Sequence, residues 1–159
     1  MPRCNAPTAS FGFMYISPVP DPDRPDPLKR MKVYVLAEEL VEKSWPDMEL
    51  VRDNPITGEI VGQMYKSIGS IPANISEGYS KSSGKDRARS FEYALGSARE
   101  TVDWYNAVKP VVGEKVVTER LTVLGDIRRL LVAIIPRERS RTIRPVKLRR
   151  KRQIPPSRS

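Results

Sequence analysis

Apolar and small residues recur at steps of three or four positions between residues 60 and 78. The positions are Ile60, Met64, Ile68, Ile71, Ile75 and Gly78. This spacing places all of them on one face of an α-helix, as in a helix that packs inside a bundle. Pro72 falls within the pattern, and an interior proline costs about 3 kcal/mol and kinks a helix. Because the pattern continues in register beyond Pro72, we predict one kinked helix rather than two separate ones.

A first helix is expected upstream of this segment. Asp26 can cap the free N–H groups of a first turn, and Pro27 has no N–H group that would need a partner there. Apolar residues then follow at helical spacing. Trp45 precedes Pro46, and a residue before proline avoids the α region of backbone conformations. We therefore predict that the first helix ends near Lys43.

Two more helices are expected downstream. The third runs from about residue 85 to residue 108, and Ser83 followed by Asp86 resembles a capping box at its start. The fourth runs from about residue 114 to residue 135, where Pro136 is expected to end it. The intervening turn contains proline and glycine, which are typical of turns.

No segment alternates apolar and polar residues as a half-buried strand does. Four amphipathic helices joined by short turns predict an all-α fold, an antiparallel up-down four-helix bundle over residues 28–138. Residues 1–27 hold seven of the fifteen prolines, which predicts a disordered arm. Residues 139–159 are predicted to form a basic, disordered tail.

The positive charge of the chain, +9 overall, is concentrated at one end. Residues 1–27 hold two basic and three acidic residues, and residues 28–138 hold seventeen and sixteen. Residues 139–159 hold nine basic residues and no acidic one. A block of like charge stays extended and gains free energy on phosphates by releasing their counterions. The charge pattern therefore predicts a polyanion-binding tail on a nearly neutral helical body.

Nucleic acid, DNA or RNA, is the partner that this tail fits best. Seven of its nine basic residues are arginines, whose guanidinium groups suit bidentate phosphate contacts. The tail has no aromatic residue for base stacking, so we expect contacts to the backbone with little sequence preference. An acidic protein partner, or a tail without a specific partner, remains an alternative. The predicted nucleic-acid-binding residues are Arg139, Arg141, Arg144, Lys147, Arg149, Arg150, Lys151 and Arg152.

The residue types that are absent narrow the possible chemistry. The chain has no histidine and one cysteine, Cys4, so it lacks the usual ligand sets for zinc and the histidine of the common catalytic triads. We therefore predict a non-enzymatic protein without cofactor or metal. An enzyme that pairs the carboxylates of Glu77 and Glu100 is the alternative.

The same composition bears on the compartment. A lone cysteine cannot form an intramolecular disulfide, which fits a reducing environment. No secretory signal is recognised at the N-terminus, and the apolar run from Leu130 to Ile135 is too short to span a bilayer. A cytoplasmic protein without membrane contact is expected.

A polar stripe runs beside the apolar face of the second helix. Its members are Gln63, Ser67, Ser70, Asn74, Glu77 and Lys81. The short serine and asparagine side chains favour close helix contact with hydrogen bonds, and polar groups at a helix seam fix register and assembly state. We predict a structural network in preference to a ligand site. If Glu77 is buried, its carboxylate needs a partner, for which Arg99 and Lys81 are the candidates.

This part of the sequence resembles the four-helix-bundle family named for proteins encoded in 23S rRNA intervening sequences. That family also includes the accessory variability determinant of diversity-generating retroelements. The resemblance begins at residue 28 and covers residues 28–135. Its most specific parts are Ser-Ile-Pro-Ala-Asn-Ile-Ser-Glu-Gly at residues 70–78 and Phe-x-x-Ala-Leu-Gly-Ser-x-x-Glu at residues 91–100. The motif residues are Gln63, Ser70, Pro72, Asn74, Glu77, Gly78, Gly96, Ser97 and Glu100.

The resemblance implies an assembly and a set of partners. Members form homopentameric barrels of four-helix bundles, so self-association is expected. The retroelement member binds nucleic acid and a reverse transcriptase through a basic surface. The body of this chain is instead nearly neutral, and its two arms look like additions. We expect an accessory or scaffold protein that binds nucleic acid, with a protein–protein adaptor, for example for a reverse transcriptase, as the alternative.

Overall fold

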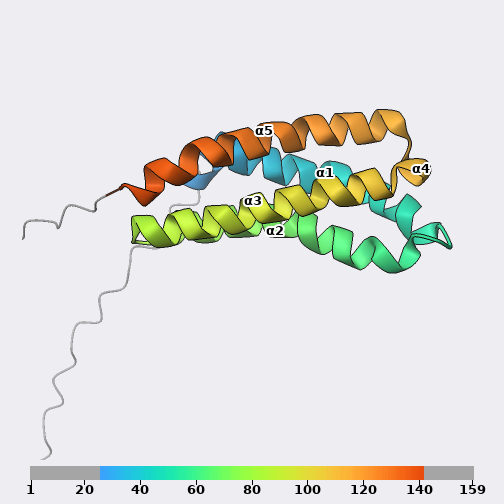
Figure 1. Ribbon diagram of the computed structural model, residues 1–159, viewed down its shortest axis with the longest axis horizontal. Coiled ribbons are helices and arrows are strands. Elements are labelled where there is room, and N and C mark those ends of the chain that lie inside the picture. Colours follow the sequence, from blue (N-terminus) through green and yellow to red (C-terminus); the bar gives the residue numbers. More distant parts are fainter. Residues whose placement is uncertain (1–25, 142–159) are drawn as a thin grey trace, which may run out of the picture.

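The computed structural model describes residues 26–141, and every regular element in this range is a helix (Figure 1). This confirms the prediction of an all-α fold. In chain order the elements are η1 (Pro27–Arg30), α1 (Lys32–Asp53), η2 (Gly58–Ile60), α2 (Val61–Ser80), α3 (Gly84–Ala107), α4 (Lys109–Val112) and α5 (Glu114–Arg139). The two predicted arms lie largely outside the described residues.

The four long helices lie side by side and enclose one apolar core. α3 packs against α2 on one side and α5 on the other, while α1 contacts both α2 and α5 (Figure 1). The predicted apolar face of α2 points into this core: Met64, Ile68, Ile71 and Ile75 are fully buried. Within residues 26–141, no helix is both long and apolar enough to cross a membrane.

Local sequence signals set several helix ends. The Asp26 carboxylate accepts a hydrogen bond from the Leu28 N–H at 2.9 Å, and the Ser83 hydroxyl accepts one from the Asp86 N–H at 3.3 Å. Both caps were predicted, although Asp26 opens the 3-10 helix η1 rather than α1. The turn before α5 contains the one-turn helix α4 and ends at Gly113, whose φ of +88° favours glycine.

Two predicted helix ends are wrong, and both had been placed at a proline. α1 continues through Pro46 to Asp53, and α5 continues through Pro136 to Arg139. Beyond Pro46, Met48 and Val51 are buried in the core. Burying a large apolar side chain stabilises by about 1.5–3 kcal/mol, so this packing offsets the roughly 3 kcal/mol cost of the proline. Core packing thus holds α1 together past its local stop signal. Beyond Pro136, Glu138 and Arg139 instead form ion pairs with side chains of α3.

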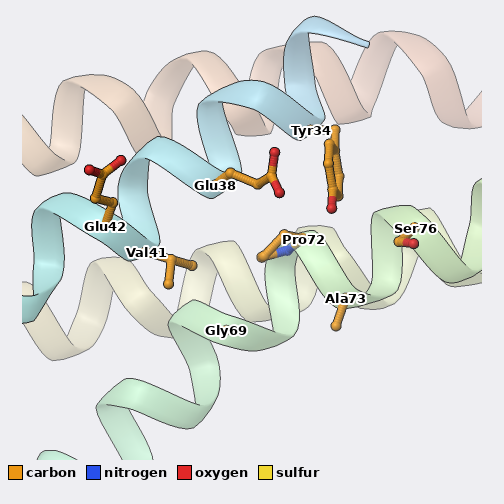
Figure 2. A pocket seen from close by; sticks show the side chains of 8 residues that line it. All are labelled: Tyr34, Glu38, Val41, Glu42, Gly69, Pro72, Ala73 and Ser76. Atoms are coloured by element: carbon orange, nitrogen blue, oxygen red, sulfur yellow. The ribbon is translucent and has the colours of Figure 1, made fainter. Parts of the chain in front are cut away.

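Pro72, in contrast, lies within one continuous helix, as predicted. Figure 2 shows that α2 changes direction beside Gly69, just before Pro72. Proline has no N–H group to donate to the carbonyl four residues earlier, and its ring crowds that carbonyl. The resulting bend carries the first half of α2 away from the rest of the helix (Figure 1).

Candidate nucleic-acid interface and helix motif

The base of the basic segment belongs to the folded part of the chain. Arg139 lies in the last turn of α5, and its guanidinium group pairs with Glu92 on α3. Arg141 follows α5, and its Nη1 lies 3.4 Å from Glu138 Oε2. Both side chains are more than half exposed. The other predicted nucleic-acid-binding residues, Arg144, Lys147, Arg149, Arg150, Lys151 and Arg152, lie outside the described residues.

The end of α5 is fixed against the turn between α2 and α3. Arg87 Nε lies 2.8 Å from Glu138 Oε2, and Arg87 Nη1 donates to the Tyr79 carbonyl oxygen at 2.7 Å. The Arg87 guanidinium also lies over the Tyr79 ring, 5.4 Å from its centroid. A Cβ atom on Gly84 would come within 2.7 Å of the Arg141 carbonyl oxygen, so the two segments touch through their backbones. The basic segment therefore leaves the body at an anchored point, which sequence reasoning missed.

The polar stripe on α2 makes most of its hydrogen bonds within its own helix. The Ser70 hydroxyl donates to the Lys66 carbonyl at 2.7 Å, and Asn74 Nδ2 donates to the Ser70 carbonyl at 2.7 Å. Glu77 is exposed and pairs with Lys81 at 2.8 Å, so Lys81 rather than Arg99 is its partner. These side chains leave polar surface on the outer flank of α2.

One member of the stripe does reach another helix. The hydroxyls of Ser67 on α2 and Thr101 on α3 are both buried and lie 3.0 Å apart. Thr101 also bonds the Ser97 carbonyl at 2.8 Å. Further along the same pair of helices, a Cβ atom on Gly78 would lie 2.8 Å from the Phe91 ring. Gly78 is thus the motif residue that lets α2 and α3 approach closely.

The remaining motif residues are at or near the surface. Gln63, Gly96 and Glu100 are exposed, and Ser97 and Pro72 are half-buried. Glu100 accepts a long hydrogen bond, 3.4 Å, from Trp104 Nε1. Since Ser67 lies opposite Thr101, Glu77 and Glu100 are separated by on the order of 13 Å along the helices. The structure does not bring these two carboxylates together.

A groove separates α1 from α2 next to the bend (Figure 2). Its volume is about 510 Å³, and it is lined by Tyr34, Glu38, Val41 and Glu42 from α1 and by Gly69, Pro72, Ala73 and Ser76 from α2. A second hollow between the same two helices includes Trp45 and Tyr65, whose rings meet edge to face at 5.9 Å. Trp45 is 56% exposed and Tyr65 is 44% exposed. The sequence pattern did not reveal this apolar surface, because it depends on the bend in α2.

A buried polar cluster joins α1, α3 and α5. Arg120 Nε lies 2.8 Å from Asp47 Oδ2, and its Nη2 donates to the Lys43 carbonyl at 2.8 Å. The Tyr105 hydroxyl lies 2.9 Å from the same Asp47 oxygen and 2.7 Å from the Ser44 hydroxyl. Burial raises the pKa of Tyr105 above its ordinary value, because the charged phenolate would lose its solvation. This cluster acts as a structural tie between three helices.

The described residues bring together no group of three or more His, Cys, Asp or Glu side chains that could hold a metal ion. A family model described as 23S rRNA-intervening sequence protein matches residues 29–112. The matched range contains α1 to α4 and all nine motif residues. No curated protein matches the chain significantly.

Proposed function

Since the chain belongs to the family of 23S rRNA-intervening sequence proteins, we propose that it is a non-enzymatic scaffold protein that binds nucleic acid through its basic C-terminal segment. The observation that carries this proposal is the separation of charge. All nine charged residues among residues 139–159 are basic, while the helical body is nearly neutral. Neutralising phosphates with such a segment releases condensed counterions, which gives affinity without sequence preference.

The anchored end of α5 supports this function. Arg87 and Glu138 hold the last turn of α5 against the start of α3, and both side chains are largely buried. Arg139 and Arg141 therefore stand at fixed positions on the surface, where the rest of the basic segment begins. A tail that starts from an ordered point keeps its charge near one end of the helical body.

The test is to replace Arg144, Lys147, Arg149, Arg150, Lys151 and Arg152 with glutamine in the full chain. We expect the affinity for a labelled single-stranded RNA to fall. The slope of log K against log salt should decrease by about 0.7 for each lost phosphate contact. Fluorescence anisotropy over a series of salt concentrations measures both quantities.

The matched control removes the same amount of charge elsewhere. Replacing six exposed basic residues of the helical body with glutamine should leave the slope near that of the original protein: Lys32, Lys43, Arg52, Lys66, Lys85 and Lys115. Equal losses in the two variants would show that net charge alone acts, and would refute a binding role of the tail.

We further propose that the four long helices form an antiparallel bundle and that five copies associate into a ring in the cytoplasm. The family resemblance supports this arrangement. The exposed Trp45 and Tyr65 also support it, since a single chain leaves this apolar surface uncovered. Native mass spectrometry should give five times the chain mass of 18.0 kDa. A monomer mass at micromolar concentration would contradict the assembly.

The apolar hollow between α1 and α2 that includes Trp45 and Tyr65 favours a second candidate function, a protein–protein adaptor with a partner such as a reverse transcriptase. In that case Trp45→Ala should abolish co-purification of the partner after nuclease treatment, whereas the tail variant should retain it. Retention by Trp45→Ala and loss by the tail variant would instead support the nucleic-acid function.

A further inference from the structure

The body of the protein is nearly neutral overall, but its positive charges are not evenly spread. A groove of about 370 Å³ runs between α3 and α5, and three of its six lining residues are arginines. Arg99 comes from α3, while Arg128 and Arg129 come from α5. The remaining lining residues, Leu95, Gly125 and Val132, carry no charge. The groove thus gathers cationic groups from two helices.

Two of these arginines are not neutralised by the protein. Arg129 pairs with Asp126, one turn earlier on α5. Among residues 26–141, neither Arg99 nor Arg128 makes an ion pair with a carboxylate. Arg128 is also half-buried, so its charge is less screened by solvent than that of a fully exposed side chain. Cationic groups on opposite walls of a groove repel each other, and a bound anion between them would remove this repulsion.

The lining of the groove suits a sugar–phosphate strand better than a single inorganic anion, because it combines arginines with apolar side chains. Apart from its own helix backbone and chain neighbours, Gly125 has no heavy atom within 4 Å of the place where a Cβ would stand, so the groove is open at this position. The lining also includes two apolar side chains, Val132, which is 55% exposed, and Leu95, which is 8% exposed. A sugar–phosphate strand presents both charged oxygens and apolar ribose carbons, which match arginines that flank apolar side chains.

The groove leads toward the base of the basic segment. Arg128 and Arg139 are eleven residues apart on α5, which corresponds to about 16 Å along the helix. Arg139 bridges to Glu92 on α3, so it lies at the junction of the same two helices. One strand can therefore follow the groove and continue onto the tail.

We propose that the α3/α5 groove is a second nucleic-acid site, in which Arg99, Arg128 and Arg129 bind successive phosphates of the strand held by the basic tail. The inference rests on the proposed function for the identity of the strand and extends it to the folded body. The groove gives the complex a defined path over the protein, which a tail alone does not provide.

The test uses the full chain with Arg99→Gln, Arg128→Gln and Arg129→Gln combined. Binding of fluorescein-labelled oligouridine is measured by anisotropy across a salt series. The slope of log K against log salt should fall by about 2 in total, at about 0.7 per lost contact. The matched control combines Lys43→Gln, Arg52→Gln and Lys66→Gln, which remove three exposed charges from α1 and α2 and should leave the slope unchanged.

The outcomes separate this inference from the function on which it rests. If the groove variant matches its control while the tail variant loses binding, the groove site is refuted and the tail function stands. If the tail variant binds normally and the groove variant does not, the tail function fails and the groove site is supported. If polyglutamate displaces oligouridine as effectively as unlabelled RNA, or if the groove variant changes the native mass, an acidic protein or another copy occupies the groove and the inference is overturned.

Discussion

Replacing Asp47 with alanine should destabilise the protein far more than the removal of a surface charge. The Asp47 side chain is 5% exposed, and its oxygens lie 2.8 Å and 3.3 Å from nitrogens of Arg120 and 2.9 Å from the Tyr105 hydroxyl. Asp47→Ala leaves the Arg120 guanidinium, 11% exposed, without its buried counter-charge. In this variant Arg120 keeps its hydrogen bond from Nη2 to the Lys43 carbonyl oxygen.

The magnitude follows from the geometry of the cluster. Removing one partner of a buried ion pair costs about 3–5 kcal/mol. Glu119 lies 3.7 Å from Arg120 Nη1 and is half-exposed, so it can recover part of the interaction. We therefore expect about 3 kcal/mol, which is a large part of the roughly 5–15 kcal/mol that stabilises a typical domain. The melting temperature should fall by on the order of 10 °C.

Urea unfolding followed by far-UV circular dichroism measures this loss. The midpoint should move to lower urea at an unchanged m-value. Protein concentration must be equal in all samples, because self-association couples stability to concentration. Asp53→Ala is the matched control. It lies on the same helix and removes a solvent-exposed pair with Arg52, which contributes little to stability.

A double variant separates the buried charge from the loss of packing. Asp47→Ala combined with Arg120→Met removes the unpaired cation, so it should be more stable than Asp47→Ala alone. If Asp47→Ala costs no more than Asp53→Ala, the cluster does not hold the three helices together and the reasoning is wrong.

Three further predictions concern the same helices. Gly78→Ala should lower the free energy of unfolding in urea by about 1–3 kcal/mol, because the added Cβ would press on the Phe91 ring. Gly69→Ala is the contrasting substitution: its Cβ would meet open space, so it should stabilise α2 by up to about 1 kcal/mol. Stability should fall as the pH rises above 10.0, the ordinary pKa of tyrosine, because the pKa of Tyr105 is raised in the folded protein and the unfolded chain ionises first. Tyr105→Phe should lose less stability over that range, and equal pH profiles would contradict the prediction. Gly84→Ala should increase hydrogen exchange in the last turn of α5, since its Cβ would collide with the backbone there; protection equal to that of the original protein would count against the anchored end.

The sequence determined much of the helical framework. The period of three and four in α2 specifies which face is apolar, and Met64, Ile68, Ile71 and Ile75 on that face are fully buried. Ile60, the first position of the pattern, lies in η2 and is only partly buried. The side chains of Asp26 and Ser83 cap N–H groups two and three residues later, so these caps can be predicted from the local sequence. The concentration of charge in residues 139–159 is likewise a property of the chain alone. These signals depend only on residues close together in the chain, so the amino-acid sequence is enough to predict them.

Only the tertiary structure decided where the helices end and which charged groups meet. Local rules place helix ends at Pro46 and Pro136, but α1 continues because residues beyond Pro46 are buried in the core. The end of α5 beyond Pro136 is held by ion pairs to α3. Asp47 and Arg120 are 73 residues apart in sequence, and their pairing follows from the way α1 and α5 pack. The packing of α3 against α5 likewise brings Arg99 and Arg128 to the same groove. The physical reason is that periodicity defines the faces of single helices, whereas burial and charge pairing arise only when those faces are brought together.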